Sequence, residues 1–264
     1  NGDLYEGLFI DGQRNGKGTF RYINGDLYVG NWANDHANGK GEYYYENGDS
    51  YVGYWIDHKK NGKGEFTYSD GKKYQGDFIN DEITGLGVLT YADGKKYDGS
   101  WVNGKLEGQG IYTDLTGNKY EGSWKNNLFH GDGKYIYSNG DIYIGNWRDG
   151  EREGFGKMKY ADGTVYEGKW KKDEIGKKGT IVYPEKIGKK KTQQKWKTYI
   201  GEQSSFLPNG TGEMQYYDTS EFYMYKGDWK MGIFAGKGEL IYRNGRRYNG
   251  TFKDGKKDGN GKII

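Results

Sequence analysis

Aromatic residues and glycines alternate along this chain with a period of two. Tyr28, Gly30 and Trp32 occupy every second position, and the same Tyr-x-Gly-x-Trp order returns at Tyr51 and at Tyr97. A period of two is typical of a β-strand, whose side chains point alternately to opposite faces, whereas a helix repeats about every 3.6 residues. The pattern therefore predicts a succession of short strands.

The strand pattern recurs with a spacing of 23 residues, and a fixed spacing of this kind indicates a repeat protein. The tyrosines that open the units are Tyr5, Tyr28, Tyr51, Tyr74, Tyr97, Tyr120, Tyr143, Tyr166, Tyr199, Tyr225 and Tyr248. A glycine follows each of them by two residues, and a Trp or Phe by four, except at Gln203. We therefore expect eleven units.

Each unit is predicted to be a β-hairpin, because a Gly-x-Gly pair opens a second strand pattern after the first. Dipeptides such as Asn24-Gly25 supply the positive φ angles that tight hairpin turns need. The polar stretch between Ala33 and Asn38 is expected to be the longer, variable loop.

Large rings are predicted to lie over glycines on one face of the sheet. Pairing that keeps the aromatic residues of the second unit together joins Tyr28 to Tyr43, Gly30 to Gly41 and Trp32 to Gly39. An aromatic ring that covers a neighbouring glycine offsets the weakness of glycine in a strand. The ladder that we expect to form the core includes Tyr28, Gly30, Trp32, Gly39, Gly41, Tyr45, Tyr51, Gly53, Trp55, Tyr97, Gly99, Trp101, Tyr143, Gly145 and Trp147.

Consecutive hairpins are expected to pair edge to edge. The predicted fold is all-β, an elongated, twisted and curled antiparallel sheet of a single layer. Because one layer buries little apolar surface, we expect the sheet to curl until its aromatic face closes on itself. Its stability should be close to a sum of terms between neighbouring repeats.

Composition supports a folded chain. Hydrophobic residues make up only 33% of the 264 residues, but 17% are aromatic and the net charge is only +3, whereas disordered chains are poor in aromatic residues. The absence of cysteine excludes disulfides, cysteine-based zinc sites and a cysteine nucleophile. No apolar stretch approaches the roughly 20 residues of a membrane span, and none has the form of a signal peptide.

The combined order of Tyr-x-Gly-x-Trp, Gly-x-Gly, tyrosine and Asn-Gly at this period resembles the MORN repeat. The resemblance covers nearly the whole chain and implies an elongated array of MORN β-hairpins that acts as a scaffold or attachment module. It implies an intracellular protein of cytoskeletal assemblies, and the arrays of ciliary, axonemal radial-spoke heads are the most similar in architecture. MORN arrays also occur fused to lipid kinases, to junction-forming membrane proteins and to methyltransferase domains.

The period is broken between the eighth and tenth units. Lys177 stands where the first loop glycine is expected, ten extra residues precede Tyr199, and Gln203 replaces a tryptophan. We therefore expect a regular array over 1–183, an interrupted zone over 184–224 with a kink or bulge whose side chains contact partners, and two further units over 225–264.

Both ends of the sequence resemble the interior of the array. Asn1-Gly2-Asp3-Leu4-Tyr5 repeats the residues of Asn24 to Tyr28, and the last unit stops within a strand pattern. We expect this sequence to be part of a longer protein, with a kinase domain, a lipid anchor or more repeats outside it. Exposed sheet edges would otherwise favour self-association edge to edge.

We find no catalytic, cofactor or metal site in the sequence. No Gly-Lys pair is followed by Ser or Thr, which removes the P-loop, and the Gly-x-Gly pairs lack the helix that a dinucleotide site needs. His36, His58 and His130 occupy different offsets in their units, so they are not expected to form a column. The recurrent Gly-Asp dipeptides are interpreted as turns rather than calcium loops.

Lysines are concentrated in one segment. Residues 169–197 contain eleven lysines and three acidic residues, a net charge of +8. The candidate docking residues are Lys177, Lys178, Lys186, Lys189, Lys190, Lys191, Lys195 and Lys197. They would suit a phosphoinositide membrane, the acidic tails of tubulin or an acidic partner segment, and the alternative is a solvated insertion. Nucleic acid is not expected, because few aromatic residues lie nearby.

Three functions remain after this survey. The first is a non-enzymatic scaffold that docks protein partners along the array. The second is attachment to the cytoplasmic face of an anionic membrane through the lysines. The third is a module that binds a small ligand or sugar in aromatic cages, because stacked aromatic hairpins also form cation–π sites.

Overall fold

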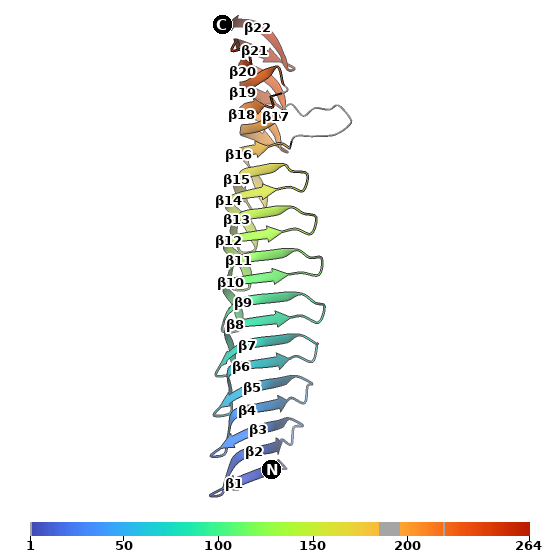
Figure 1. Ribbon diagram of the computed structural model, residues 1–264, viewed down its shortest axis with the longest axis vertical. Coiled ribbons are helices and arrows are strands. Elements are labelled where there is room, and N and C mark those ends of the chain that lie inside the picture. The colour runs from blue at the N-terminus through green and yellow to red at the C-terminus, as the bar shows by residue number, and fades with distance from the viewer. Residues whose placement is uncertain (1, 185–195, 219) are drawn as a thin grey trace. The chain divides into compact units, whose positions relative to one another are not determined.

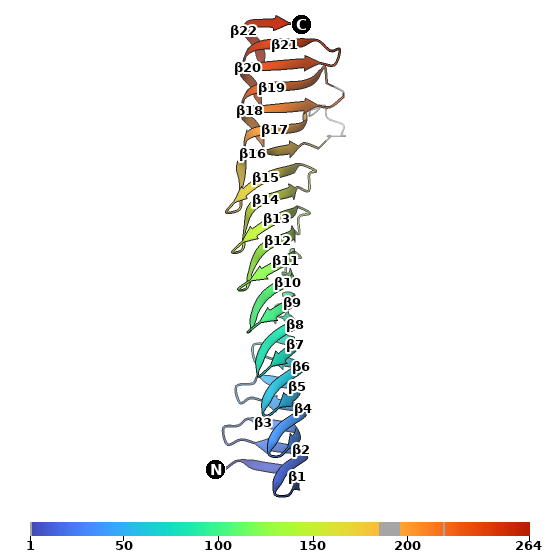
Figure 2. The same cartoon turned by 90° about the vertical axis from the view of Figure 1, so that its left-hand side faces the viewer.

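The structure is a computed structural model that describes residues 2–184, 196–218 and 220–264. In these residues it is all-β and contains 22 strands. The chain forms two compact units, Asn1–Gly133 and Lys134–Ile264, and each is treated by itself. Within each unit consecutive strands lie side by side (Figures 1 and 2).

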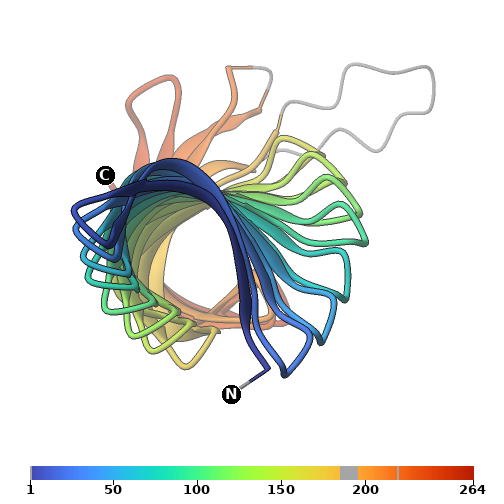
Figure 3. The ribbon, with the colours of Figure 1, turned by 90° about the horizontal axis from the view of Figure 1, so that it is seen from below.

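The strands of the first unit alternate between seven and nine residues. They are β1 (Leu4–Ile10), β2 (Gln13–Arg21), β3 (Leu27–Ala33), β4 (His36–Tyr44), β5 (Ser50–Ile56), β6 (Lys59–Thr67), β7 (Lys73–Ile79), β8 (Glu82–Thr90), β9 (Lys96–Val102), β10 (Lys105–Thr113), β11 (Lys119–Lys125) and the start of β12 (Leu128–Ile136). Seen end on, these strands are curved (Figure 3).

The second unit continues with the end of β12 and ten further strands. They are β13 (Ile142–Arg148), β14 (Glu151–Lys159), β15 (Val165–Lys171), β16 (Glu174–Val182), β17 (Trp196–Ser204), β18 (Leu207–Tyr216), β19 (Phe222–Lys230), β20 (Ile233–Tyr242), β21 (Arg247–Lys253) and β22 (Lys256–Ile263). The predicted interrupted zone thus contains the hairpin β17–β18, and residues 185–195 and 219 lie outside the described residues.

Antiparallel pairing of consecutive strands confirms the tandem hairpins. For example, β3 pairs with β2 on one side and β4 on the other, and β20 pairs with β19 and β21. The expected closure of the aromatic face on itself is wrong for the sheet. In both units the described pairings join only strands that follow one another in sequence, so that curvature does not close the sheet.

The positions of the short and long connections are the reverse of those predicted. β3 and β4 are joined by the two residues Asn34 and Asp35, whose φ angles are 49° and 69°. Positive φ at both positions is the condition for a tight hairpin turn, and Asn and Asp tolerate it because their short side chains bond locally. The stretch from Ala33 to Asn38 is therefore a two-residue turn between strand residues and not a variable loop.

The Asn-Gly and Asp-Gly dipeptides instead lie in the longer connection between hairpins. In the loop from β2 to β3, Gly25 has a φ of 96° and its N–H donates to the carbonyl oxygen of Tyr22 at 3.0 Å. The N–H of Tyr22 donates to the oxygen of Asp26, also at 3.0 Å. The glycine provides a left-handed residue within a wider loop, a role that the dipeptide alone does not distinguish from a two-residue turn.

The predicted register holds for half of each hairpin. Tyr28 is opposite Tyr43 and Gly30 is opposite Gly41, as expected. The register then shifts, so that Trp32 is opposite Ala37 and not Gly39. Gly39 has a φ of 96° and is opposite Trp55 of the next hairpin in the strand register. This β-bulge inserts residues into the second strand, which alternation of residue types did not reveal.

Tyrosine rings cover a continuous column of paired glycines. Gly18 pairs with Gly30, Gly30 with Gly41, and Gly41 with Gly53, across successive strands. The buried Tyr28 ring lies on this column, and a Cβ atom on Gly41 would stand 2.7 Å from its Cζ atom. Its hydroxyl donates to the carbonyl oxygen of Asn31 at 2.9 Å. The predicted seating of rings over bare backbone is thus confirmed at Tyr28.

The same seating repeats in both units. Fully buried tyrosines of this column are Tyr28, Tyr51, Tyr74, Tyr97, Tyr120, Tyr143, Tyr166, Tyr199 and Tyr225. Gly39 is not part of the column, since its Cβ position faces Asn31 and no ring. Tyr45 is half-buried and contacts Tyr43 and Phe66 beside the column, at ring-centroid distances of 4.5 and 5.9 Å.

Where a repeat carries a tryptophan at this position, the tryptophan joins its hairpin to the one before it. The indole Nε1 of Trp55 donates to the carbonyl oxygen of Gly41 at 3.2 Å. Its ring meets Tyr51 of its own repeat and Tyr28 of the previous repeat edge to face, at 5.2 and 5.4 Å. Edge-to-face aromatic pairs contribute about 0.5–1.5 kcal/mol each beyond the area that they bury, so these contacts couple neighbouring repeats.

Removing the bare backbone under a ring should destabilise the fold. In Gly110→Ala the new Cβ would stand 2.6 Å from Cζ of Tyr97, while the backbone of Gly110 is not left-handed. We expect a loss of about 1–3 kcal/mol in the free energy of unfolding, because the ring is enclosed and cannot move away. Chemical denaturation measures it.

Gly104→Asn is the matched control for this prediction. Gly104 has a φ of 71° and nothing within 4 Å of its Cβ position, and Asn accepts such a φ. This variant should lose less than about 0.5 kcal/mol in the free energy of unfolding. Equal losses in the two variants would show that the ring does not set the need for glycine.

The tyrosine column should also set the alkaline limit of the fold. Burial raises the pKa of Tyr97 to about 12 from its ordinary value of 10.0, and burial likewise raises the pKa of Tyr28 and Tyr143. A raised pKa in the folded state favours folding fully below pH 10.0, and this contribution is lost as the pH rises towards 12.

We therefore expect tyrosinate absorbance at high pH to appear in two phases. Tyrosines outside the buried column ionise without unfolding, and the column ionises together with the loss of the β-sheet circular dichroism signal. Ionisation of all tyrosines in one phase, with the β signal intact, would contradict this account.

Candidate partner-binding surfaces

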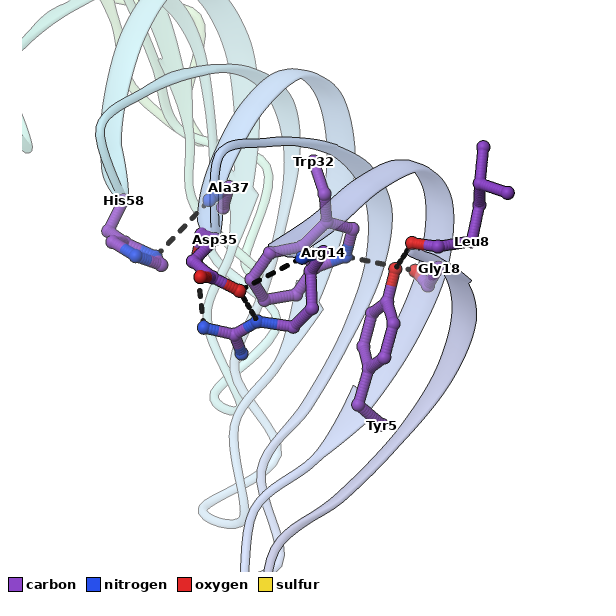
Figure 4. Close-up of polar contacts among 8 residues, drawn as sticks. All are labelled: Tyr5, Leu8, Arg14, Gly18, Trp32, Asp35, Ala37 and His58. Carbon is purple, nitrogen blue, oxygen red and sulfur yellow. Dashed lines mark hydrogen bonds and ion pairs between the residues drawn. The ribbon is translucent and has the colours of Figure 1, made fainter. Parts of the chain in front are cut away.

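The sheet presents an inner face, which carries the tyrosine column, and an outer face, which carries the alternate residues. On the inner face the guanidinium of Arg14 lies 4.4 Å from the ring centroid of Trp32 (Figure 4). Its Nε donates to Oδ1 of Asp35 at 3.1 Å and its Nη2 to the carbonyl oxygen of the same residue at 2.8 Å. The charge of Arg14 is thus held within the array.

The same arrangement of an arginine between a tryptophan ring and an aspartate recurs in the second unit. Arg152 bonds Oδ1 of Asp173 at 2.8 Å and lies 4.4 Å from the centroid of Trp170. At the equivalent position of another repeat, the Nζ of Lys60 donates to the hydroxyl of Tyr45 at 2.8 Å. These inner-face cations stabilise the stacking of hairpins rather than leaving charge free for a ligand.

Aspartates of the Gly-Asp dipeptides tie successive loops together. Oδ1 of Asp26 accepts the N–H of Glu46 at 2.8 Å, and Asp49 accepts that of Ser69 in the same way. Burial opposes the charge of Asp26, but hydrogen bonds from Tyr43, Glu46 and Asn24 hold the pKa of this carboxyl below its usual value. The recurrent aspartate is therefore explained by bonds between loops.

Two histidines lie closer together than their offsets suggested. The rings of His36 and His58 are 4.9 Å apart, because the tight turns of consecutive hairpins stack. Nδ1 of His58 accepts the N–H of Ala37 at 3.3 Å (Figure 4), and burial followed by the proximity of His36 lowers the pKa of His58. The described residues contain no group of three or more side chains placed to hold a metal ion.

The outer face carries apolar side chains that the core does not use. Val29, Val52 and Tyr54 are 39%, 47% and 47% exposed. Lys40 is opposite Tyr54 and Glu42 is opposite Val52 in the strand register. Together with Lys63 these side chains line an open groove of about 350 Å³ in the first unit. We call this set of six residues the outer groove.

A comparable groove lies on the second unit. It has a volume of about 510 Å³ and is lined mainly by polar and charged residues, among them Lys226, Lys237, Glu239, Asn249 and Thr251. The lining residues of the two grooves occupy the same positions within their repeats, on the outer side of the glycine column, but they differ in chemistry. The outer positions of the repeat therefore vary while the inner ones are fixed.

The predicted lysine site is only partly described. Lys186, Lys189, Lys190, Lys191 and Lys195 lie outside the described residues.

The three candidate lysines that are described do not form one patch. Lys177 and Lys178 are exposed on β16, and Nζ of Lys178 pairs with Glu202 at 3.1 Å. Lys197 is exposed near the other end of the β16–β17 pair, where its carbonyl oxygen accepts the N–H of Tyr183. Docking at the lysines therefore stays a prediction.

The irregular ninth repeat builds a feature that the sequence did not predict. Gln203, which replaces the tryptophan, is 7% exposed and donates from Nε2 to the carbonyl oxygen of Gly176 at 2.7 Å. Its Oε1 accepts the N–H of Phe206 at 3.0 Å. The ring of Phe206 then reaches Tyr166 at 6.2 Å, so Phe206 contacts the tyrosine that a tryptophan would otherwise meet.

Phe206 also borders a cavity within the second unit. The cavity has a volume of about 470 Å³ and is lined by Asp141, Tyr160, Ala161, Asp162, Thr164, Tyr183, Ser205, Phe206 and Leu207. Phe206 has a φ of 62° in this tight turn, which is unusual for a phenylalanine. The sequence signal nearby was Gln203 in place of a tryptophan, which marks the repeat as irregular but does not indicate a cavity. We call this cavity the Phe206 cavity.

Comparison with solved structures finds distant likenesses. The chain is similar to the TCP10c domain of Drosophila melanogaster Sas-4, with 14% identity over 64% of this chain and 100% of that one and a TM-score of 0.37. It is also similar to the TCP10 domain of Danio rerio CPAP, with 14% identity over 97% and 90% of the two chains and a TM-score of 0.22. Similarities this low do not assign a function. No curated protein sequence matches the chain.

In the described residues no helix is long and apolar enough to cross a membrane. The model of the MORN repeat family matches nine segments: 5–27, 28–50, 51–73, 74–96, 97–119, 120–142, 143–165, 225–246 and 248–264. The two further predicted units, which begin at Tyr166 and Tyr199, are not matched, although the structure forms hairpins there. With nine matched repeats over most of its length, the chain belongs to the MORN repeat family.

Proposed function

We propose that this chain is a non-enzymatic scaffold that docks segments of protein partners along its repeats, within a cytoskeletal assembly such as a ciliary radial spoke head. The observation that carries the proposal is the outer groove. Val52 and Tyr54 stay exposed on strands whose inner residues are fully used by the core. Apolar residues grouped with charged neighbours on a surface are typical of sites for protein partners.

The different roles of the inner and outer faces support a scaffold rather than an enzyme. On the inner face Arg14 is bound by Asp35 and the column hydroxyls donate to backbone carbonyls, as Tyr28 does to Asn31. These groups hold the repeats together. The outer positions are free to differ from repeat to repeat, so one array can present several partner sites in a fixed order. The assembly is proposed from the resemblance to cytoskeletal MORN arrays.

Positive charges placed in the outer groove should weaken partner binding. The test uses a partner that has been purified by its binding to the wild-type chain. We expect the triple variant Val29→Lys, Val52→Lys and Tyr54→Lys to bind this partner with an affinity at least about tenfold lower, because buried apolar contacts are lost. The matched control combines Val29→Thr, Val52→Thr and Tyr54→Phe, which keep shape and β-propensity. Affinity is measured by calorimetry with the isolated partner, and circular dichroism checks folding.

Unchanged affinity of every isolated partner for the lysine variant would reject the outer groove as the docking site. The non-enzymatic scaffold function would be rejected if the purified chain turned over a substrate and if this activity were lost in a folded variant that changes one polar side chain.

A second candidate function is attachment to an anionic membrane. It is favoured by the net charge of +8 over residues 169–197 and by the exposure of Lys177 and Lys197. Each lysine near a phosphoinositide surface contributes about 1 kcal/mol of binding at moderate salt.

Liposome flotation tests the membrane function. Changing Lys186, Lys189, Lys190 and Lys191 to Glu should reduce flotation on phosphoinositide vesicles by at least about tenfold. The control changes Lys17, Lys59, Lys105 and Lys125, four exposed lysines of the first unit, to Glu. Equal flotation of both variants, or flotation that does not depend on salt, would dismiss a specific role for the lysine segment.

A further inference from the structure

The Phe206 cavity differs in chemistry from the grooves of the outer face. Aromatic and aliphatic side chains, those of Tyr160, Tyr183, Phe206 and Leu207, supply much of its lining. Its volume of about 470 Å³ is within the range of small-molecule sites, roughly 300–1,000 Å³. It exists because the turn between β17 and β18 carries Phe206 to the loops of earlier hairpins.

The rings that line the cavity are held in place. Phe206 meets Tyr160 edge to face, with centroids 5.3 Å apart and planes at 80°. The hydroxyl of Tyr183 donates to the carbonyl oxygen of Phe206 at 2.7 Å, which fixes the turn against the buried ring. Burial raises the pKa of Tyr160 and of Tyr183, so both phenols are neutral near pH 7. The aromatic surface is thus preorganised.

Two carboxylates stand among these rings. Asp141 accepts the N–H of Ala161 at 2.8 Å on Oδ1 and the Nδ2 of Asn139 at 3.0 Å on Oδ2. Asp162 accepts the N–H of Thr164 at 2.8 Å on Oδ1. Among the residues that the structure describes, Oδ2 of Asp162 has no hydrogen bond or ion pair.

Among the described residues, no basic side chain lines the cavity to balance these charges. Arg152, which acts electrostatically on Tyr160, is already paired with Asp173 at 2.8 Å. The cavity therefore combines negative charge with aromatic surface. This combination is complementary to an organic cation, which gains from both the carboxylates and the ring faces.

We propose that the Phe206 cavity binds an alkylammonium group, as carried by a lysine side chain or by a quaternary amine. The ammonium lies beside Asp162, and its alkyl substituents contact Tyr160 and Phe206. The site goes beyond the scaffold function and does not rest on it, because it belongs to one irregular repeat and shares no residue with the outer groove.

A regular loop that shares four residues with this one lacks these features. Tyr91-Ala92-Asp93-Gly94 repeats the order Tyr160-Ala161-Asp162-Gly163, but Lys95 follows it where Thr164 stands in the cavity loop. Asp93 therefore pairs with Lys95 at 2.9 Å. The proposed site needs both Thr164, which leaves Asp162 without a lysine in its own loop, and Phe206 of the ninth repeat. The loop at Asp93 provides a control within the chain.

Nuclear magnetic resonance on the full chain, labelled with ¹⁵N, tests the proposal. The probes are butylammonium, which reproduces a lysine side chain, and tetramethylammonium, a quaternary amine. Neutral tert-butanol and butylguanidinium are the comparison compounds, all at matched ionic strength. We expect saturable shifts of the amides of residues 160–164 and 205–207 with one or both ammonium probes, and affinity at least about threefold weaker for tert-butanol.

Variants assign the binding to the named groups. Asp162→Asn and Phe206→Leu should each lower the affinity for the ammonium probe by at least about threefold. The first change removes the charge, and the second removes the aromatic face but keeps an apolar side chain. Asp93→Asn, the control, should leave the affinity unchanged. The amide spectrum of each variant away from the cavity reports that it is folded.

The two ammonium probes separate the possible sources of the group. Tighter binding of butylammonium supports a lysine of a protein segment, and tighter binding of tetramethylammonium supports a quaternary amine. Absence of saturable shifts, equal binding of tert-butanol, preference for butylguanidinium, or affinities that Asp162→Asn and Phe206→Leu leave unchanged would each overturn the proposal.

Discussion

The seating of a tyrosine ring on a pair of glycines is the contact on which the rest of this structure depends. Tyr28 fills the space that side chains on Gly30 and Gly41 would need, and the glycines of adjacent strands continue this bare column through each unit. Because the ring lies within its own repeat, a single layer of strands gains a buried core. This explains how a chain with 33% hydrophobic residues and 48 glycines folds.

Coupling between repeats follows from the same arrangement. Trp55 meets the tyrosines of two repeats and bonds Gly41 of the earlier one, while Asp26 ties successive loops. Each repeat therefore contacts mainly its neighbours, and stability accumulates along the array. The core uses only the inner face, so the outer positions can differ from repeat to repeat without loss of the fold. The outer groove and its polar counterpart near Lys237 illustrate this freedom.

Residue types predicted the core because glycine is unusual inside a strand, and an aromatic residue two positions away can cover its bare backbone. The spacing of Tyr28, Gly30 and Trp32 was enough to predict strands, pairing partners and the seating of rings. The turns were misassigned, because Asn-Gly suits both a two-residue turn and a wider loop, whereas Asn34 and Asp35 adopt left-handed angles without any glycine. The β-bulge that displaces Trp32 from Gly39 is a matter of backbone geometry, which period-two alternation does not encode.

The candidate sites depend on tertiary contacts that a linear pattern does not contain. Stacked turns bring His36 to His58, although the two occupy different offsets in their repeats. Phe206 contacts Tyr160 and Tyr166, distant in sequence, because Gln203 leaves the position of a tryptophan vacant. The sequence marked the ninth repeat as irregular, but only the fold reveals which residues the irregularity brings together.

A double-mutant cycle on Tyr74 and Gly87 tests the central contact most directly. A Cβ atom on Gly87 would stand 2.5 Å from Cζ of Tyr74. If the ring creates the need for glycine, Gly87→Ala costs much less stability in a Tyr74→Ala chain than in the wild type. We predict a coupling free energy of about 1–3 kcal/mol from denaturant unfolding of the four chains. Additive effects, with coupling below about 0.5 kcal/mol, would contradict the account.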